Sequence, residues 1–475
     1  MSQKNHSIPQ PRFKLPFLGH SLYLRKNMYS SLHELSSKLG PICQLALGSN
    51  KIILVSSFEL IKEVCDESRF EKHIGPFMRF LRSQLFKEGL AFFDTQDPIW
   101  GKSFRIVLPG FQQKIIQEEY FPSMLKTMEK LFNKWDNNSG SEINLSNEMG
   151  HTILDIIGLC GFSYHFNSIS SGSHLIKALD EAVALLAKKA FTPKFLDKLQ
   201  FQSNKEYQEK ASLIFTCVDE ILKARKQAKP THTDLLHFML NGVDKMTGEK
   251  LNDYSIKNQI LSLIVASYES TLNALILSFC ALLTYPAVLE KAYAEVDRVL
   301  GTDPGQPQRA QSFFKLTYIQ QVINECLRYW STLFLERSPL KDTMLGGYPV
   351  KKGECIWTLI SAAHGNKRLW GDDADSFNPD RFAPELVSGR DPSAFLGFGI
   401  GQRSCIGRQF AMFEISVILG MFLQKYQIHK SPKFKIDIKK VFNIQIDKTL
   451  WVTLEKRKHE KSKNESFQIS QGVVA

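Results

Sequence analysis

The sequence predicts a mainly helical protein with a small β region, an α+β fold class, and two kinds of apolar pattern support that prediction. Between residues 121 and 245, and again over 252–283, apolar side chains recur at helical spacing, with polar loops between the segments. Residues 42–57 instead alternate between apolar and polar positions and are rich in β-forming side chains. A second β-rich part is expected near 335–360.

Two helix starts can be placed more closely. Ser57 is a plausible N-cap for a helix over 58–70, because its hydroxyl can accept a hydrogen bond from an early backbone N–H. Asp97 followed by Pro98 forms a cap and first-turn pair for a helix over 97–107.

The segment 252–283 is apolar on all sides in its middle, so we expect one long helix that runs through the core and ends before Pro286. Within it, residues 267–271 read Ser-Tyr-Glu-Ser-Thr. A carboxylate inside a buried helix is costly unless it is paired or used. From the residues alone, a structural network and a catalytic group are equally good interpretations.

Composition indicates a soluble globular protein, with 43% hydrophobic and 23% charged residues among 475. We expect one domain over residues 1–457 and a basic polar tail over 458–475. Residues 1–14 are polar and contain proline, so no signal peptide or membrane span is expected, and a cytoplasmic location follows.

The net charge of +12 is spread along the chain without interleaved aromatic residues. A solvated basic face is therefore a better interpretation than nucleic-acid binding. The specific partner that such a charge favours is an acidic electron carrier.

The loop over residues 398–407, Phe-Gly-Ile-Gly-Gln-Arg-Ser-Cys-Ile-Gly, is the main candidate for a functional site. Its Cys405 stands where a loop becomes a helix, a position that favours a thiolate. Arg403 is placed to pair with carboxylates on a large anionic cofactor. Taken alone, Cys405 is more often an inert core residue. A dinucleotide loop is rejected because Gln402 replaces the last glycine of that motif.

The spacing Phe-x-x-Gly-x-Arg-x-Cys-x-Gly resembles the haem-binding signature of the cytochrome P-450 family at every fixed position. The resemblance implies haem b, with Cys405 as the thiolate ligand of the iron, Phe398 beside the sulfur and Gly407 closing the signature. It implies that Arg403 binds a haem propionate. A thiolate ligand favours cleavage of the O–O bond of bound oxygen.

Two more propionate ligands are implied by the resemblance, Trp100 through its indole N–H and Arg337. Relatives commonly carry an arginine four residues after this tryptophan. Phe104 occupies that place here, which leaves Arg105 out of register.

The resemblance also gives the central helix a role. Glu269 and Ser270 align with an acid-alcohol pair that organises water for proton delivery to bound O2. Thr271 is an alternative source of the alcohol. Ser267 replaces the usual glycine, and Tyr268 adds bulk beside it.

Glu325 and Arg328 stand three residues apart on one helix face, and Arg381 is the second arginine found in the family. We expect these three to form a buried structural network around the cysteine loop.

Local stretches most resemble the haem domain of bacterial flavocytochrome fatty-acid hydroxylases, the P-450BM-3 group. Relatives anchor the fatty-acid carboxylate at the positions of Asn50 and Leu54, where neither required residue type is present. Lys51, a possible substitute, faces the other side of its strand. Ala91 replaces the aromatic that shields the haem, and Ala266 is assigned to the pocket with it. A long-chain fatty acid and another apolar molecule are therefore both expected substrates.

The expected activity is insertion of one oxygen atom from O2 into a C–H bond. The chain ends where the reductase linker of those relatives would start, so we expect electrons from a separate ferredoxin or flavodoxin with its reductase. A peroxygenase is disfavoured, because that group places an arginine at the acid-alcohol pair. The alternative from another class is a non-catalytic haem sensor or carrier.

Overall fold

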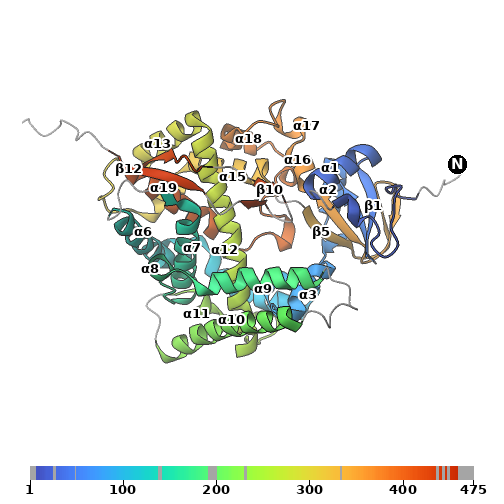
Figure 1. Cartoon of the computed structure of the whole chain (residues 1–475), viewed down its shortest axis with the longest axis horizontal. Helices are drawn as coiled ribbons and strands as arrows, with labels where there is room; N and C mark the ends of the chain where they lie inside the picture. Colours follow the sequence, from blue (N-terminus) through green and yellow to red (C-terminus); the bar gives the residue numbers. More distant parts are fainter. Residues whose placement is uncertain are drawn as a thin grey trace, which may run out of the picture.

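A long helix, α12 (Asp253–Thr284), crosses the middle of the computed structural model (Figure 1). Asn252 caps it, since its side chain accepts a hydrogen bond from the backbone N–H of Ser255. The helix is long and apolar enough to cross a membrane by length and composition, but 61% of its most apolar window is buried, as in a core helix. The helix predicted over 252–283 is confirmed.

The structure describes residues 7–24, 28–48, 50–136, 142–190, 201–228, 233–331, 334–434, 438–440, 444–446 and 450–457. The predicted tail over 458–475 lies outside the described residues.

Most of the other long helices surround α12 (Figure 1). It packs against α7 (Leu145–Phe162), α13 (Pro286–Leu300), α15 (Thr317–Tyr329) and α19 (Arg408–Lys425). The helix α6 (Phe121–Asp136) packs against α7 and α19. Their facing apolar side chains form the largest core cluster. Because α19 directly follows the cysteine loop, this core fixes the position of that loop.

The remaining helices are shorter or peripheral. They are α1 (Met28–Leu39), α2 (Phe58–Val64), α3 (Pro76–Gln84), α4 (Pro98–Val107), α5 (Gln113–Ile115), α8 (Ser168–Ser171), α9 (His174–Ala190), α10 (Phe201–Gln227), α11 (Leu235–Asn241), α14 (Ala310–Phe314), α16 (Ile360–His364), α17 (Lys367–Trp370) and α18 (Pro384–Val387). A π-helical turn covers Ile116–Tyr120, and 3-10 turns cover Ser21–Leu24, Leu90–Phe92, Leu108–Phe111, Pro379–Phe382, Pro392–Ala394 and Gly401–Arg403.

Each of the two predicted β-rich parts contributes strands to one five-stranded sheet. Its strands are β1 (Ile42–Leu47), β2 (Asn50–Val55), β8 (Cys355–Leu359), β5 (Phe334–Pro339) and β3 (Phe70–Lys72), in the spatial order β1-β2-β8-β5-β3. Strands β2 and β8 pair in parallel, and the other pairs are antiparallel. One apolar face packs against α1 and the other against α2. Because both faces are covered, β2 is buried continuously over residues 52–55, and the strict alternation predicted for residues 42–57 is not observed.

The smaller sheets are peripheral. They contain β4 (Ile143–Asn144), β12 (Trp451–Lys456) and β9 (Tyr426–Lys430) in that spatial order, the pair β6 (Thr343–Leu345) and β7 (Tyr348–Val350), and the pair β10 (Ile438–Lys440) and β11 (Ile444–Ile446).

The helix predicted over 58–70 is too long. Ser57 caps α2 as expected, accepting a hydrogen bond from the backbone N–H of Leu60, but the helix ends at Val64. Asp66 then accepts hydrogen bonds from the backbone N–H and the hydroxyl of Ser68. Such local side-chain bonds offer the backbone an alternative to the helix.

Candidate active site

The cysteine loop presents its thiol just before α19. The Cys405 backbone N–H donates to the Phe398 carbonyl at 2.8 Å, which closes the loop, and the Cys405 side chain is exposed. Gly399 and Gly401 have φ values of 72° and 76°, in the region that favours glycine. A Cβ on Gly401 would lie 2.1 Å from a carboxylate oxygen of Glu67. At these two positions the loop therefore has a backbone shape that only glycine can adopt.

The protonation of Cys405 differs from the sequence-based expectation. Neighbouring protein keeps water from much of its surroundings and raises the pKa of the thiol. The Gly407 backbone N–H and the Arg408 guanidinium act in the opposite direction but do not outweigh this loss of solvation. The helix end is therefore insufficient by itself to favour a thiolate. A coordinated metal deprotonates such a thiol outright.

Three cations converge beside the loop. Arg403 donates to the Phe93 carbonyl at 2.9 Å and to Thr95 Oγ1 at 3.3 Å. Arg337 on β5 donates to the Glu336 carbonyl at 3.1 Å and is buried. Lys72 on β3 lies directly opposite Arg337 in the strand pairing. Among the described residues, none of the three forms an ion pair with a carboxylate.

The electrostatic cost of this arrangement appears in the pKa values. Loss of solvation, with repulsion from Arg403 and Arg337, lowers the pKa of Lys72 to about 7. Burial likewise lowers the pKa of Arg403 to about 10, and it lowers the pKa of Arg337. Cations so placed favour a bound dianion. A haem carries two propionates, and the trio beside an accessible thiol fits that group.

Lys72 was not predicted as a site residue. Its Nζ donates to the Ala91 carbonyl at 2.9 Å, which links β3 to the turn after α3. Lys72 reaches the site because β3 pairs with β5, and these two segments are more than 260 residues apart. No local sequence pattern indicates that pairing.

Trp100 is buried on α4, and its ring lies 4.4 Å from the Arg403 guanidinium carbon, a cation–π contact. This places it beside Arg403, and its role as an N–H donor to a haem propionate stays a prediction. Phe398 likewise supports a guanidinium, with the Arg408 carbon 5.3 Å from its ring centre. Gly407 is the N-cap of α19, and a Cβ there would lie 4.0 Å from the Cys405 sulfur.

Arg105 serves a different purpose from Arg403. Its Nε and Nη2 donate to the two carboxylate oxygens of Asp244 at 2.6 and 2.8 Å. This bidentate pair joins α4 to the loop after α11, and it holds the pKa of Asp244 well below its usual range. Arg105, which stands one residue after the usual arginine position, thus has a structural role.

The first prediction contrasts these two arginines. Arg403→Ala is expected to weaken haem binding by about 10- to 100-fold, because a charge-assisted hydrogen bond to a propionate is lost. Arg105→Ala should leave haem affinity unchanged while lowering stability. Titration of apoprotein with haem, followed by visible absorbance, measures both. Equal effects of the two variants would contradict the assignment of Arg403.

The central helix has one exposed face in its otherwise buried middle. Ala266, Glu269 and Ser270 are exposed there, at the spacing that places residues on one helix face. Thr271 is only 2% exposed. Ser270 donates its hydroxyl to the Ala266 carbonyl at 2.6 Å, so its oxygen can still accept a hydrogen bond. The structure thus favours Ser270 over Thr271 as the accessible alcohol.

Ser267 and Tyr268 do not crowd that face as strongly as their sizes suggest. Ser267 donates to the Leu263 carbonyl at 2.5 Å, one turn back along the helix. Tyr268 points to α7, where a Cβ on Gly150 would lie 2.8 Å from its hydroxyl oxygen. The glycine on α7 therefore makes room for the tyrosine.

The predicted pocket residues lie in different parts of the structure. Asn50 is exposed at the start of β2, whereas Leu54 is 1% exposed and packs in the core cluster under α1. Ala91 is half-buried in the turn that Lys72 contacts, close to the three cations. The pocket roles of Asn50, Leu54, Ala91 and Ala266 stay predictions.

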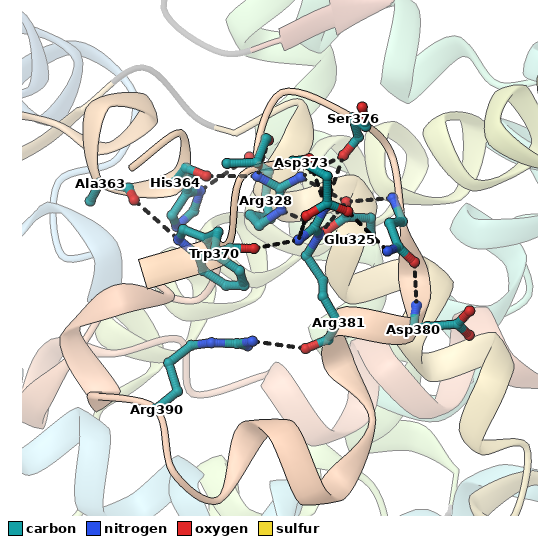
Figure 2. Close-up of polar contacts among 12 residues, drawn as sticks. Glu325, Arg328, Ala363, His364, Trp370, Asp373, Ser376, Asp380, Arg381 and Arg390 are labelled. Carbon is teal, nitrogen blue, oxygen red and sulfur yellow. Dashed lines mark hydrogen bonds and ion pairs between the residues drawn. The ribbon is translucent and has the colours of Figure 1, made fainter. Parts of the chain in front are cut away.

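Glu325, Arg328 and Arg381 form the expected buried network (Figure 2). Arg328 donates to both carboxylate oxygens of Glu325 at 2.6 and 2.7 Å. Arg381 donates to the same carboxylate at 3.2 Å and to Asp373 at 2.9 Å. The Asn378 backbone N–H also donates to Glu325, at 2.8 Å. One carboxylate thus compensates two guanidinium groups in the protein interior.

Arg328 also organises the chain around it. Its remaining N–H groups donate to the carbonyls of His364, Ala374 and Ser376 at 2.7, 2.9 and 3.1 Å. Arg381 donates to the Trp370 carbonyl at 2.6 Å. The network therefore fixes the long connection between β8 and the cysteine loop (Figure 2).

His364 extends this network to the cysteine loop and was not predicted. Its Nε2 accepts a hydrogen bond from the Leu396 backbone N–H at 3.0 Å, and its Nδ1 lies 3.2 Å from the Arg328 carbonyl. Since a backbone N–H only donates, the ring must be neutral with its proton on Nδ1. Burial and the nearby Arg328 lower the pKa of His364 to about 3.

A second prediction concerns pH. The unfolded chain takes up a proton on His364 near pH 6.5, but the folded chain does so only near pH 3. Stability is therefore full above pH 6.5 and falls with falling pH, by up to about 1.4 kcal/mol per pH unit in this window. His364→Gln should reduce that slope by one proton, as measured by urea unfolding at several pH values. An unchanged slope would show that the imidazole is not buried and neutral.

The described residues contain no group of three or more His, Cys, Asp or Glu side chains that could hold a metal ion.

This chain is similar to several known proteins. A model of the family described as "Cytochrome P450" matches residues 9–450. A bifunctional cytochrome P450/NADPH–P450 reductase of Bacillus cereus is 36% identical over 456 residues, and one of Bacillus subtilis is 35% identical over 463. A self-sufficient cytochrome P450 monooxygenase of Oidiodendron maius is 32% identical over 455 residues. These matches cover 94–95% of this chain but only 42–43% of each relative, so the chain spans less than half of their length.

Proposed function

The chain belongs to the cytochrome P450 family, and on that premise we propose that it is a haem-thiolate monooxygenase. It inserts one oxygen atom from O2 into a C–H bond of an apolar substrate, and a long-chain fatty acid is the first candidate. We also propose that residues 1–457 act as one haem-binding domain in the cytoplasm.

One observation carries this proposal. An accessible cysteine stands two residues after Arg403, and Arg403 shares its surroundings with Arg337 and Lys72, three cations without a carboxylate ion pair in the described part of the chain. Carboxylates such as Asp94, Glu71 and Glu336 offset part of this positive charge but form no ion pair with it, so the basic trio can still bind an anionic group. The two propionates of a haem held by Cys405 would compensate them.

The bound haem supplies the oxidising power of the reaction. Cys405 would hold the metal and donate electron density through its sulfur. Arg403, Arg337 and Lys72 would bind the carboxylates of the macrocycle, and the glycine loop would keep the sulfur in place. The Glu325 network holds the segment that leads into this loop.

We propose that Glu269 and Ser270 deliver protons to the oxygen site. Both lie on the exposed face of α12, and the Ser270 oxygen can accept a hydrogen bond from water while its hydrogen is held by Ala266. The small side chains of Ala266 and Ala91 would leave room for an apolar chain beside the haem.

The substrate class has a specific alternative. Neither Asn50 nor Leu54 offers a charge to a carboxylate, and Leu54 is buried in the core. A neutral apolar molecule is therefore the second candidate substrate. Electrons come from a ferredoxin or flavodoxin with its reductase, and the net charge of +12 favours an acidic carrier.

The test is a substrate titration followed by turnover. Long-chain fatty acids should shift the haem spectrum from low to high spin, and hydroxylated acid should form with O2, NADPH and a surrogate ferredoxin and its reductase. A shift with neutral apolar molecules alone would select the second candidate. No oxygen-dependent product with any substrate that shifts the spectrum would contradict a monooxygenase and favour a haem carrier.

A third prediction separates the two alcohols on α12. Ser270→Ala should lower product per electron by about tenfold, with the electrons recovered as hydrogen peroxide, because proton delivery is impaired. Thr271→Val, which keeps the shape of a buried side chain, should retain normal coupling. Product and peroxide are measured against NADPH consumed. The reverse pattern would assign the proton relay to Thr271.

A further inference from the structure

A group of exposed apolar side chains lies near the N-terminal end of the described chain. This N-terminal surface consists of Phe13, Phe17, Leu18, Leu22 and Tyr23, all exposed large hydrophobic residues. Phe17 is 97% exposed. Figure 1 places this end of the chain beside β1, at the opposite end of the molecule from α6 and α8. Exposed apolar groups gathered in this way mark an interaction surface.

The tip that carries Phe17 is held rigidly. Leu15 and Gly19 exchange two backbone hydrogen bonds of 2.9 Å on either side of it. Gly19 approaches the edge strand β1 so closely that a Cβ would lie 2.2 Å from the Ala46 carbonyl oxygen. His20 adds two hydrogen bonds with the Ala46 backbone, of 2.6 and 2.9 Å. The exposure of Phe17 is therefore built into the fold.

Phe17 also has an unfavourable backbone conformation. Its φ of 61° lies in the left-handed region, which bulky residues other than glycine rarely adopt. Its ring gains almost no packing within the chain, because nearly all of it is exposed. Such local strain is retained where it serves a function.

The charge of this region has one sign. Glu34 is the first acidic residue of the chain, and five basic residues precede it: Lys4, Arg12, Lys14, Arg25 and Lys26. Arg12 and Lys14 are exposed and flank Phe13. Glu34 itself pairs with Lys38 at 2.5 Å, so it does not offset these charges. In the part of this surface that the structure describes, the apolar tip is therefore flanked by the positive charges of Arg12 and Lys14.

We propose that the N-terminal surface binds an anionic lipid bilayer, with Phe17 inserted among the acyl chains and Arg12 and Lys14 beside the phosphates. An exposed aromatic in a basic surround is the composition that favours peripheral membrane binding. A second copy of the chain fits less well, because docking this surface against itself would bring like charges together. This inference goes beyond the proposed catalytic function and does not depend on it.

The test is co-sedimentation of the full haem-loaded chain with lipid vesicles. Vesicles of phosphatidylcholine containing a quarter phosphatidylglycerol should bind it, vesicles of phosphatidylcholine alone should bind it much less, and high salt should release it. Phe17→Asn should weaken binding by about tenfold or more. Asparagine tolerates a positive φ, so this variant should fold with an unchanged or higher unfolding midpoint.

The matched control is Met246→Ser. Met246 is another apolar side chain, 76% exposed, in the loop after α11, and its replacement should leave vesicle binding unchanged. Arg12→Gln combined with Lys14→Gln should weaken binding to anionic vesicles only. The proposal is overturned if the wild-type chain binds neither vesicle type, or if Phe17→Asn and Met246→Ser behave alike.

Discussion

Glu325→Ala is expected to lower the free energy of unfolding by about 3–5 kcal/mol. Glu325 is fully buried, and its carboxylate is the partner of two guanidinium groups, Arg328 and Arg381, which are 2% and 5% exposed. Removing it leaves Arg328 without any carboxylate, while Arg381 keeps Asp373. Water cannot reach these charges to compensate them, so the loss is large. Urea unfolding followed by tryptophan fluorescence measures it.

The matched control is Glu34→Ala. Glu34 and Lys38 also form a close ion pair within one helix, but both side chains are mostly exposed. Solvent and salt already screen that pair, so its removal should have no measurable effect on unfolding. Similar losses in the two variants would show that burial does not give the Glu325 network its strength.

Glu325→Ala should also release haem more readily than the wild type at temperatures where both remain folded. The network holds the segment before the cysteine loop through Arg328, His364 and Leu396. A variant that unfolds more easily but keeps haem as tightly as the wild type would confine the network to global stability.

Cys405→Ser is expected to abolish the proposed monooxygenase activity. Serine keeps the size of the side chain but its hydroxyl is a far weaker electron donor to the metal than a thiolate. The Arg403, Arg337 and Lys72 cluster remains, so some haem should still bind. Cys326→Ser is the control, because Cys326 is buried on α15 beside Ser278 and Cys280. Its effect should fall on stability, with activity per bound haem retained. Equal activity of Cys405→Ser and wild type would remove Cys405 as the ligand.

Features that depend on nearby residues could be predicted from the sequence. The helix α12, the Asp97 cap and the buried Glu325–Arg328 pair follow from local spacing and polarity, whereas Arg381 was assigned from the family resemblance. The direction of the Tyr268 side chain could also have been predicted from helix geometry. Residues 266, 269 and 270 share one face of a helix, and residue 268 projects elsewhere.

Features that depend on distant pairing could not be predicted. Lys72 becomes a site residue only because β3 pairs with β5. His364 becomes one only because the Leu396 backbone N–H donates a hydrogen bond to its ring. The pKa of Cys405 follows from the protein packed around its sulfur and not from the helix that follows it. In each case the decisive neighbour lies in a different element, and local pattern carries no information about it.

The central claim is that Cys405 binds haem iron as a thiolate. The most direct test is the carbon monoxide difference spectrum of the reduced, haem-loaded protein. A strongly red-shifted Soret band in the wild type, absent in Cys405→Ser, is the predicted result. A wild-type band without that shift, in protein fully loaded with haem, would contradict thiolate ligation and with it the proposed monooxygenase.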